Sequence, residues 1–323
     1  MKKHFPALLC LAALLAPSQA VHAQAEAFPS KPVRMAIPFP PGGATDMIAR
    51  TLSEKVQQIW GQPLVLEYKP GAGGIIAGEF VARSAPDGHT VGMVTTSFLI
   101  NPSLRKSLPY DTLRDFAGVS TVAVSHILFA GTLSLPANTL AEVIALAKKQ
   151  PGKLAYATPG PGGAMHMSGE LLKHLTGIDI VHVPYKGGAA AYPDLMTGRV
   201  QLMFDPVFAI MPMVKSGKIK AIAMASPERA RTYPDIPVIA ETVPGYSVLS
   251  ITGIVAPRAT PRPVISRMSA DIARALQDPT LRSRMSDAGM EPRPMSPERF
   301  DAYIKAEIEK WSKVVKSAGI TPD

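Results

Sequence analysis

Two prolines and two glycines at 40–43 separate an apolar segment from an amphipathic one, and this boundary constrains the fold more than any other stretch. Residues 33–36 are apolar enough for a buried strand, whereas 47–56 carry apolar side chains at helical spacing. A strand-to-helix turn is therefore predicted, because proline stiffens the approach and glycine permits left-handed dihedrals. The free amides and positive dipole end of the helix would favour an anion. A plain tight turn, with Thr45 or Asp46 capping the helix, is the alternative.

A second turn of the same kind follows residues 154–157. Here the chain reads Thr-Pro-Gly-Pro-Gly-Gly at 158–163, and a helical pattern runs from Met165 to Leu175. Two such turns, far apart in the sequence, predict two lobes that each present a helix N-terminus to one ligand.

The chain begins with the features of a secretory signal peptide. Two lysines precede an apolar run at 5–16 that is too short for a membrane span, and small residues follow it. We expect cleavage after Ala23 or Ala25. The only cysteine, Cys10, lies in this run, so the mature protein would have no disulfide and would depend on a sizeable core.

The charge of the chain gives only broad guidance about partners. The net charge of +9 falls to +7 when the two lysines of the signal peptide are lost. The remaining lysines and arginines are scattered, with no basic run or aromatic-interleaved patch, so we expect no nucleic-acid partner. A diffuse positive field favours anionic small ligands by steering. Beyond the signal peptide, no stretch is long and apolar enough to cross a bilayer.

Strand and helix patterns alternate along the chain, which predicts an α/β fold with parallel or mixed sheets and helices on both faces. The segment 110–116 is interpreted as a short connecting helix. Two long apolar segments, 119–130 and 248–256, are interpreted as strands that cross between two lobes. Two crossings imply a hinge with a cleft between the lobes. The predicted domains are the signal peptide at 1–25, a discontinuous lobe one at 26–125 and 247–323, and lobe two at 126–246.

Several local features could form part of a ligand-binding site. Thr95, Thr96 and Ser97 follow a predicted strand at its carboxyl end, where ligands bind in open α/β sheets; Ser97 as a helix N-cap is the alternative. Asp205 also ends an apolar strand, and it could orient a ligand or cap the next helix. The glycine-rich turn at 69–74 resembles a dinucleotide fingerprint, but its spacing is imperfect and the expected acid is missing. We expect no cofactor there, and interpret the turn as a cleft wall or as packing.

The sequence contains little that indicates a catalytic site. His166, Glu170 and His174 share one helix face, but two histidines eight residues apart are too distant for comfortable chelation, so no metal is expected. Neither a Gly-x-Ser-x-Gly elbow nor a phosphate-binding loop occurs. The rival function that stays open is an exported hydrolase or metal-dependent enzyme that uses His166, Glu170 and Asp205.

Several motifs occur in a fixed order along the mature chain. They read FPSKPVR at 28–34, PFPPGGATD at 38–46, YKPGAGG at 68–74, APDGHT at 85–90, HVPYKGG at 182–188 and DLMTG at 194–198. Together they resemble the substrate-binding proteins of tripartite tricarboxylate transporters, the Bug family. One departure is Tyr68, which stands where the family usually carries asparagine.

The resemblance implies a fold similar to type II periplasmic binding proteins, with two α/β lobes that close on a ligand. The family typically binds carboxylates through backbone amides, hydroxyls and ordered water rather than an arginine clamp, and no lysine or arginine lies within 37–46 or 157–168. By resemblance, the lobe-one contacts are Phe39, Pro41, Gly42, Gly43 and Asp46. The lobe-two contacts are Thr158, Gly160, Gly162 and Gly163. Further contacts are Ser97 and Asp205, followed by His166.

The expected function is therefore capture without catalysis. A periplasmic monomer would bind a small dicarboxylate, tricarboxylate or aromatic acid and deliver it to the permease subunits of a tripartite transporter, or to a sensor kinase. Closure would be stabilised because the ligand contacts both lobes only in the closed state. The identity of the carboxylate stays open. The apolar residues that could line its pocket, or equally belong to the core, are Phe39, Phe98, Met165, Phe204 and Phe208.

Overall fold

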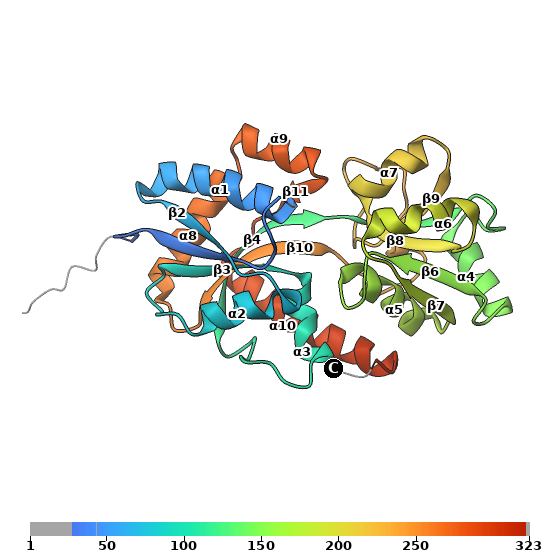
Figure 1. The fold of residues 1–323 in the computed structure, drawn as a ribbon, viewed down its shortest axis with the longest axis horizontal. Helices are drawn as coiled ribbons and strands as arrows, with labels where there is room; N and C mark the ends of the chain where they lie inside the picture. Colours follow the sequence, from blue (N-terminus) through green and yellow to red (C-terminus); the bar gives the residue numbers. More distant parts are fainter. Residues whose placement is uncertain (1–27, 43, 321–323) are drawn as a thin grey trace, which may run out of the picture.

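The computed structural model describes residues 28–42 and 44–320, which form two β-sheets flanked by helices (Figure 1). The predicted signal peptide and its cleavage position lie outside the described residues. None of the helices in the described ranges has the length and hydropathy of a membrane span.

The first sheet has six strands in the order β11-β4-β10-β3-β1-β2. Strands β1, β2 and β3 run parallel, and β10 pairs antiparallel with both β3 and β4. The strands are β1 (Val33–Ile37), β2 (Leu64–Tyr68), β3 (Thr90–Thr95), β4 (Phe116–Ser125), β10 (Ser250–Pro257) and β11 (Met290–Pro292). The helices around this sheet are α1 (Ala44–Trp60), α2 (Ile75–Ala82), α3 (Thr96–Leu104), α8 (Arg262–Ala275), α9 (Pro279–Asp287) and α10 (Pro297–Ser317).

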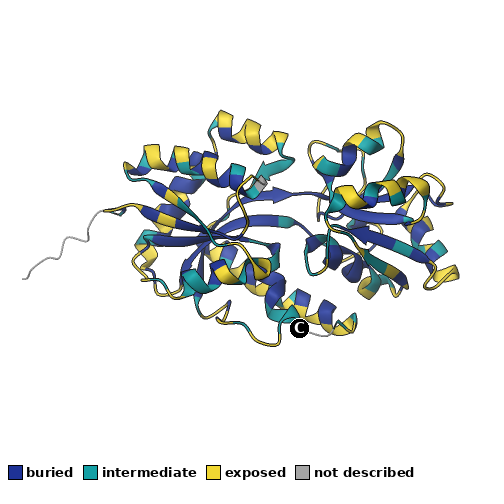
Figure 2. Ribbon diagram, in the orientation of Figure 1, coloured by how far each residue is buried: buried dark blue, intermediate teal, exposed yellow. Residues whose placement is uncertain are grey.

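The strands of this sheet are buried on both sides because helices cover both of its faces. Side chains of α1, α8 and α9 pack with Met35 and Met93 on one face, whereas α2, α3 and α10 pack with Val94 and Phe116 on the other. Figure 2 shows the strands buried and the outer sides of the helices exposed. This two-sided burial is typical of parallel and mixed α/β sheets.

The second sheet has five strands in the order β7-β6-β8-β5-β9. Strand β6 runs parallel to β7 and β8, and β5 runs antiparallel to β8 and β9. The strands are β5 (Ile127–Thr132), β6 (Leu154–Thr158), β7 (Ile180–Pro184), β8 (Leu202–Pro206) and β9 (Ile219–Met224). The helices are α4 (Leu140–Lys149), α5 (Ala164–Thr176), α6 (Tyr192–Thr197) and α7 (Val207–Lys215). Among the described residues of both lobes, the 3₁₀ turns are η1 (Ala72–Gly74), η2 (Gly188–Ala191) and η3 (Ile239–Glu241).

Two segments connect the sheets, and they lie side by side (Figure 1). His126 alone separates β4 of the first sheet from β5 of the second. On the return path, the amide of Val248 still donates to Ala225 in the second lobe, and β10 begins at Ser250. The predicted two-lobe α/β fold with two crossover strands is confirmed. The exact lobe boundaries at 126 and 246 stay a prediction.

The lobes also share packing through the C-terminal helix. Trp311 of α10 is fully buried in an apolar cluster that includes Phe98 of the first lobe and Tyr156 of the second. Lys310 donates to the carbonyl of Ser247, 2.9 Å away, so α10 also holds the return segment.

One predicted element is wrong. Residues 110–115 of the predicted helix at 110–116 form a turn instead. The Asp111 carboxylate accepts the amides of Leu113 and Arg114, and Asp115 accepts the amide of Asp111. These side-chain acceptors replace the helical carbonyls, a known competition between aspartate and the backbone. The chain then enters β4 at Phe116.

Candidate functional site

A cavity of about 240 Å³ lies where three helices begin, at the carboxyl ends of strands from both sheets. It is lined by Thr45 of α1, by Thr95, Thr96 and Ser97 at the start of α3, and by Gly163, Ala164 and Met165 at the start of α5. The first amides of a helix lack intrahelical acceptors and lie at its positive dipole end. The remaining lining residues are Phe39, Ser125, Ser250, Ile251, Thr252 and Met290. The described residues that line the cavity thus offer amides and hydroxyls, and none of them has a charged side chain, so this lining suits an anion.

The turn between β1 and α1 is held by Asp46. The backbone of Gly42 is left-handed, with φ of 97°, and its amide donates to Asp46 Oδ2 at 2.8 Å. Arg50 Nε donates to the same carboxylate at 2.9 Å, and the Tyr68 hydroxyl donates to Oδ1. With these three donors, the buried Asp46 carboxylate fixes the turn. It does not line the cavity.

The hydrogen bonds around Asp46 also set its charge. Burial disfavours the carboxylate, but the hydrogen bonds from Tyr68, Gly42 and Arg50 outweigh burial and lower the pKa of Asp46. The side chain is therefore charged at neutral pH. Tyr68, the residue that departs from the Bug pattern, supplies one of these hydrogen bonds.

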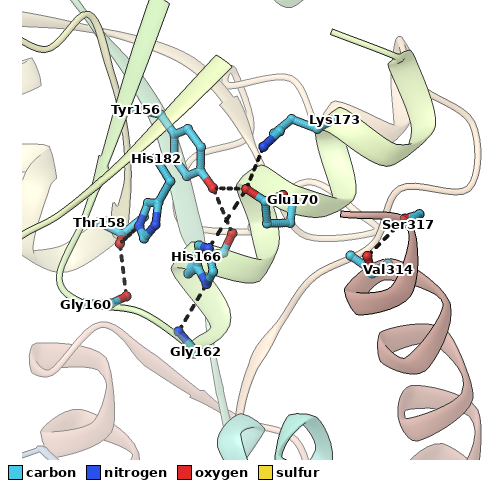
Figure 3. Close-up of polar contacts among 10 residues, drawn as sticks. All are labelled: Tyr156, Thr158, Gly160, Gly162, His166, Glu170, Lys173, His182, Val314 and Ser317. Atoms are coloured by element: carbon cyan, nitrogen blue, oxygen red, sulfur yellow. Dashed lines mark hydrogen bonds and ion pairs between the residues drawn. The ribbon is translucent and has the colours of Figure 1, made fainter. Parts of the chain in front are cut away.

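The second turn is built in the same way. Gly162 has φ of 75°, and its amide donates to His166 Nδ1 at 3.1 Å (Figure 3). The acceptor is four residues after the glycine, as it is in the first turn. The tetrapeptide Pro-Gly-Gly-Ala occurs in both turns, at 41–44 and 161–164. Thr158 Oγ1 donates to the carbonyl of Gly160 at 3.0 Å and closes the other side of the turn.

A buried polar cluster lies behind this turn (Figure 3). The rings of His166 and His182 stack with their centroids 4.0 Å apart, and His182 Nε2 lies 2.7 Å from Thr158 Oγ1. Glu170 Oε1 accepts from the Tyr156 hydroxyl at 2.6 Å and from Lys173 Nζ at 3.1 Å. Burial lowers the pKa of His166, and it lowers the pKa of His182 to about 4. Both rings are therefore neutral at pH 7.

The predicted site residues that the structure describes lie in the cavity lining, in or behind the two turns, or, for Asp205, apart from both. Phe39, Ser97 and Gly163 line the cavity. Those in the turns or behind them are Pro41, Gly42, Asp46, Thr158, Gly160, Gly162 and His166. Gly43 lies outside the described residues.

Asp205 lies apart from the cavity. Its side chain is 1% exposed, accepts from the Tyr192 hydroxyl at 2.7 Å, and packs against Gly188. Burial raises the pKa of Asp205 to about 7. The alternative that Asp205 caps the next helix is wrong, because Pro206 occupies the N-cap of α7. The alternative that Ser97 caps α3 is also wrong, because Thr95 occupies that position.

Sequence reasoning missed the part of the cavity that lies next to the crossing segments. Ser125 ends β4, and Ser250, Ile251 and Thr252 begin β10. The two predicted crossing strands could have indicated these residues, because the strands form the hinge and polar residues at a hinge lie next to the cleft.

The residues proposed for the alternative function, an exported hydrolase or metal-dependent enzyme, do not all lie close together. His166 Nε2 lies 3.9 Å from Glu170 Oε1, but Glu170 is occupied by Tyr156 and Lys173. His174 is exposed. In the part of the chain that the structure describes, no group of three or more histidine, cysteine, aspartate or glutamate side chains could hold a metal ion.

A larger cavity of about 520 Å³ adjoins the first one at Met290, which lines both. His126, at the junction of β4 and β5, also lines it, and His126 Nε2 lies 3.3 Å from Glu291 Oε1. The lining combines a loop of the second lobe with α9 and β11 of the first. Its acidic and basic residues are Glu228, Glu291, Arg229, Arg231, Arg282 and Arg293. With four arginines and two glutamates, this cavity adds positive charge beside the uncharged one.

Comparisons with known proteins agree on one family. Residues 48–320 match the family described as "Tripartite tricarboxylate transporter family receptor". The protein BugT of Bordetella pertussis is 33% identical over 298 residues, which cover 91% of each chain. A protein of R. palustris solved with adipate is 34% identical, with a TM-score of 0.74, and the match covers 92% of this chain and all of that one. MatC of Rhodopseudomonas palustris, solved with bound malate, is 33% identical, with a TM-score of 0.70 and coverage of 89% and 100%.

Proposed function

The chain belongs to the tripartite tricarboxylate transporter receptor family, and we propose that it captures a small carboxylate in the cavity where α1, α3 and α5 begin. The observation that carries this proposal is the convergence of three helix N-termini on a cavity whose lining, within residues 28–42 and 44–320, has hydroxyls and no charged side chain. Such a site binds an anion through amide donors and helix dipoles. The two related structures hold adipate and malate, which are both dicarboxylates.

In this proposal the two turns act together. Thr45 belongs to the first lobe and Gly163 to the second, and both line the cavity. A carboxylate that accepts hydrogen bonds from both sides favours the closed arrangement, because an open one loses half of its donors. Binding and release are the whole cycle, without catalysis. The partners would be the permease subunits of a tripartite transporter in the membrane, or alternatively a sensor kinase, and the protein would act as a periplasmic monomer.

Thermal unfolding in the presence of carboxylates tests this function. We expect at least one of succinate, malate, adipate, citrate, terephthalate and nicotinate to raise the unfolding temperature. A ligand at about a hundred times its dissociation constant adds roughly 2.7 kcal/mol, which corresponds to roughly 4 °C for a chain of this size. Neutral amides of the same acids serve as the matched control. If folded, ligand-free protein responds to none of the acids, carboxylate capture is wrong.

The arginine-lined cavity predicts salt-dependent association. Replacing both Arg231 and Arg293 with glutamine should slow carboxylate association several-fold at low ionic strength and leave the dissociation rate unchanged, because distant charges act on encounter. At about 0.3 M salt, screening should bring the wild type and the variant together. Stopped-flow measurements at two salt concentrations check this result. The matched control is the pair Arg83→Gln and Arg114→Gln, two exposed arginines that do not line this cavity. A changed dissociation rate would instead mean that the arginines touch the bound ligand.

A further inference from the structure

We propose that His166 is the positioning residue of the second turn, and that the carboxylate is held only while His166 Nδ1 carries no proton. Acid would then release the ligand. This inference rests on the proposed function, and it adds a regulation of the same site.

The two turns share one hydrogen-bond arrangement. Each turn has a left-handed glycine whose amide donates to a side chain four residues later: Gly42 to Asp46 at 2.8 Å, and Gly162 to His166 at 3.1 Å. The two glycines occupy the same place in the repeated Pro-Gly-Gly-Ala tetrapeptide. Asp46 and His166 therefore have the same structural task.

The two acceptors respond differently to acid. The Asp46 carboxylate stays an acceptor throughout the neutral and mildly acidic range, because its pKa is lowered. A histidine nitrogen accepts only when it is unprotonated. Protonation would place an Nδ1–H donor opposite the amide of Gly162, so two donors would face each other and the turn would have to move.

Such a movement reaches the cavity directly. Gly163, Ala164 and Met165 lie between Gly162 and His166 in the chain, and all three line the cavity. The amides at the start of α5 are the donors proposed for the carboxylate. A bound anion needs these donors at hydrogen-bond distance, so the hydrogen bond to His166 keeps the site in its binding geometry.

The groups around His166 favour its neutral form. Burial lowers its pKa, Glu170 on the same helix raises it, and Lys173 lowers it again. The Glu170 carboxylate is shared with the Tyr156 hydroxyl of β6 and with Lys173, and its oxygen is 3.9 Å from His166 Nε2. From β7, the neutral ring of His182 stacks on His166, and a charge on His166 lowers the pKa of His182 in turn.

His182 differs from His166 in its hydrogen bond. Because Thr158 Oγ1 donates to Gly160, His182 Nε2–H can donate to Thr158 in both its neutral and its charged form. Protonation of His182 therefore leaves this contact in place. The acid-sensitive contact of the turn is the one between Gly162 and His166.

The test follows nuclear magnetic resonance spectra and adipate binding from pH 7.5 downward, to a pH at which the ring resonances show that His166 is protonated. At pH 7.5 we expect the His166 ring to be in the Nε2–H tautomer, and the Gly162 amide to be protected from exchange. On acidification, His166 should protonate and this amide should lose its protection. These readouts need no ligand, so they test the hydrogen bond independently of the proposed function.

Affinity for adipate is measured in the wild type and in His166→Asn, whose side-chain oxygen can accept the amide without titrating. Below the pKa of His166, wild-type affinity should fall toward tenfold per pH unit. In His166→Asn the affinity should change by less than about threefold over the same pH range. This figure excludes the effect of adipate protonation, which is the same for both proteins. The matched control is His174→Asn, on an exposed residue of the same helix, which should keep the wild-type profile.

Each outcome decides the inference. Equal pH profiles for the wild type and His166→Asn would overturn it, and so would a Gly162 amide that stays protected after His166 protonates. Absence of adipate binding at pH 7.5 would count against adipate as a ligand under the proposed function. The resonance experiment would then decide on the acid-sensitive turn alone.

Discussion

Replacement of Gly163 with leucine is expected to lower carboxylate affinity by more than a hundredfold without loss of stability. Gly163 lines the cavity, and its backbone, with φ of −91° and ψ of 177°, is extended and open to any residue. A Cβ built there has no heavy atom within 4 Å, so the larger side chain would occupy the cavity without a clash in the fold. Its physical effect is steric exclusion of the ligand, which no other contact can replace.

Titration calorimetry and thermal unfolding check this prediction together. The unfolding temperature of Gly163→Leu should stay within about 2 °C of the wild type, because surface changes away from strained positions cost little. Gly163→Ala is the matched control, since a single methyl group should reduce affinity only partially. Unchanged affinity in Gly163→Leu would show that the ligand binds elsewhere, with the arginine-lined cavity as the first place to search.

Replacement of Asp46 with alanine should have the second-largest effect, on stability and on binding at once. The change removes the shared acceptor of the Gly42 amide, the Tyr68 hydroxyl and Arg50. A hydrogen bond to a charged group contributes about 1.5–3 kcal/mol, but Gly42 and Arg50 are exposed, so these two donors can bond to water once the carboxylate is gone. We expect a loss of roughly 1–3 kcal/mol in the free energy of unfolding, and at least a tenfold loss of affinity because the first turn is released.

A second aspartate of the chain separates these two effects. Asp271 of α8 is also 5% exposed, and it accepts from Trp60 Nε1 at 3.0 Å, Arg267 at 2.6 Å and Arg274 at 3.4 Å. It does not line the cavity. Asp271→Ala should therefore lose similar stability in urea unfolding while affinity stays unchanged. Equal affinity losses in both variants would mean that Asp46 contributes only to general stability.

The features that the sequence could predict are local ones. The two Pro/Gly turns and the alternation of strands and helices follow from turn chemistry and from hydrophobic periodicity, which both act over a few residues. The helix predicted at 110–116 failed for an equally local reason, because Asp111 and Asp115 accept the amides that a helix would use. The three-residue β11 is too short to leave a pattern.

The features that the sequence could not predict depend on segments that meet only in the fold. Ser125 and Ser250 line one cavity although they are far apart in the chain. Asp46 and His166 were expected as ligand contacts in and beside the turns, and that role stays a prediction. That each accepts the amide of a left-handed glycine required the backbone geometry. Asp205 followed a convincing strand pattern, but the packing of Gly188 and Tyr192 buries it away from the cavity.

The strand order has a consequence for the order in which the molecule can fold as the chain emerges. The second sheet uses only residues 127–224, so it can form as soon as this stretch is available. The first sheet must wait, because β10 is inserted between β3 and β4 and begins only at Ser250, whereas β4 ends at Ser125. Until then β3 carries one unpaired edge and β4 carries two, because its other partner β11 follows β10 in the chain. Such edges invite pairing with other chains. Late, long-range strand insertion is a slow step in folding, so the interval before residue 257 emerges is the one in which a chaperone would matter most.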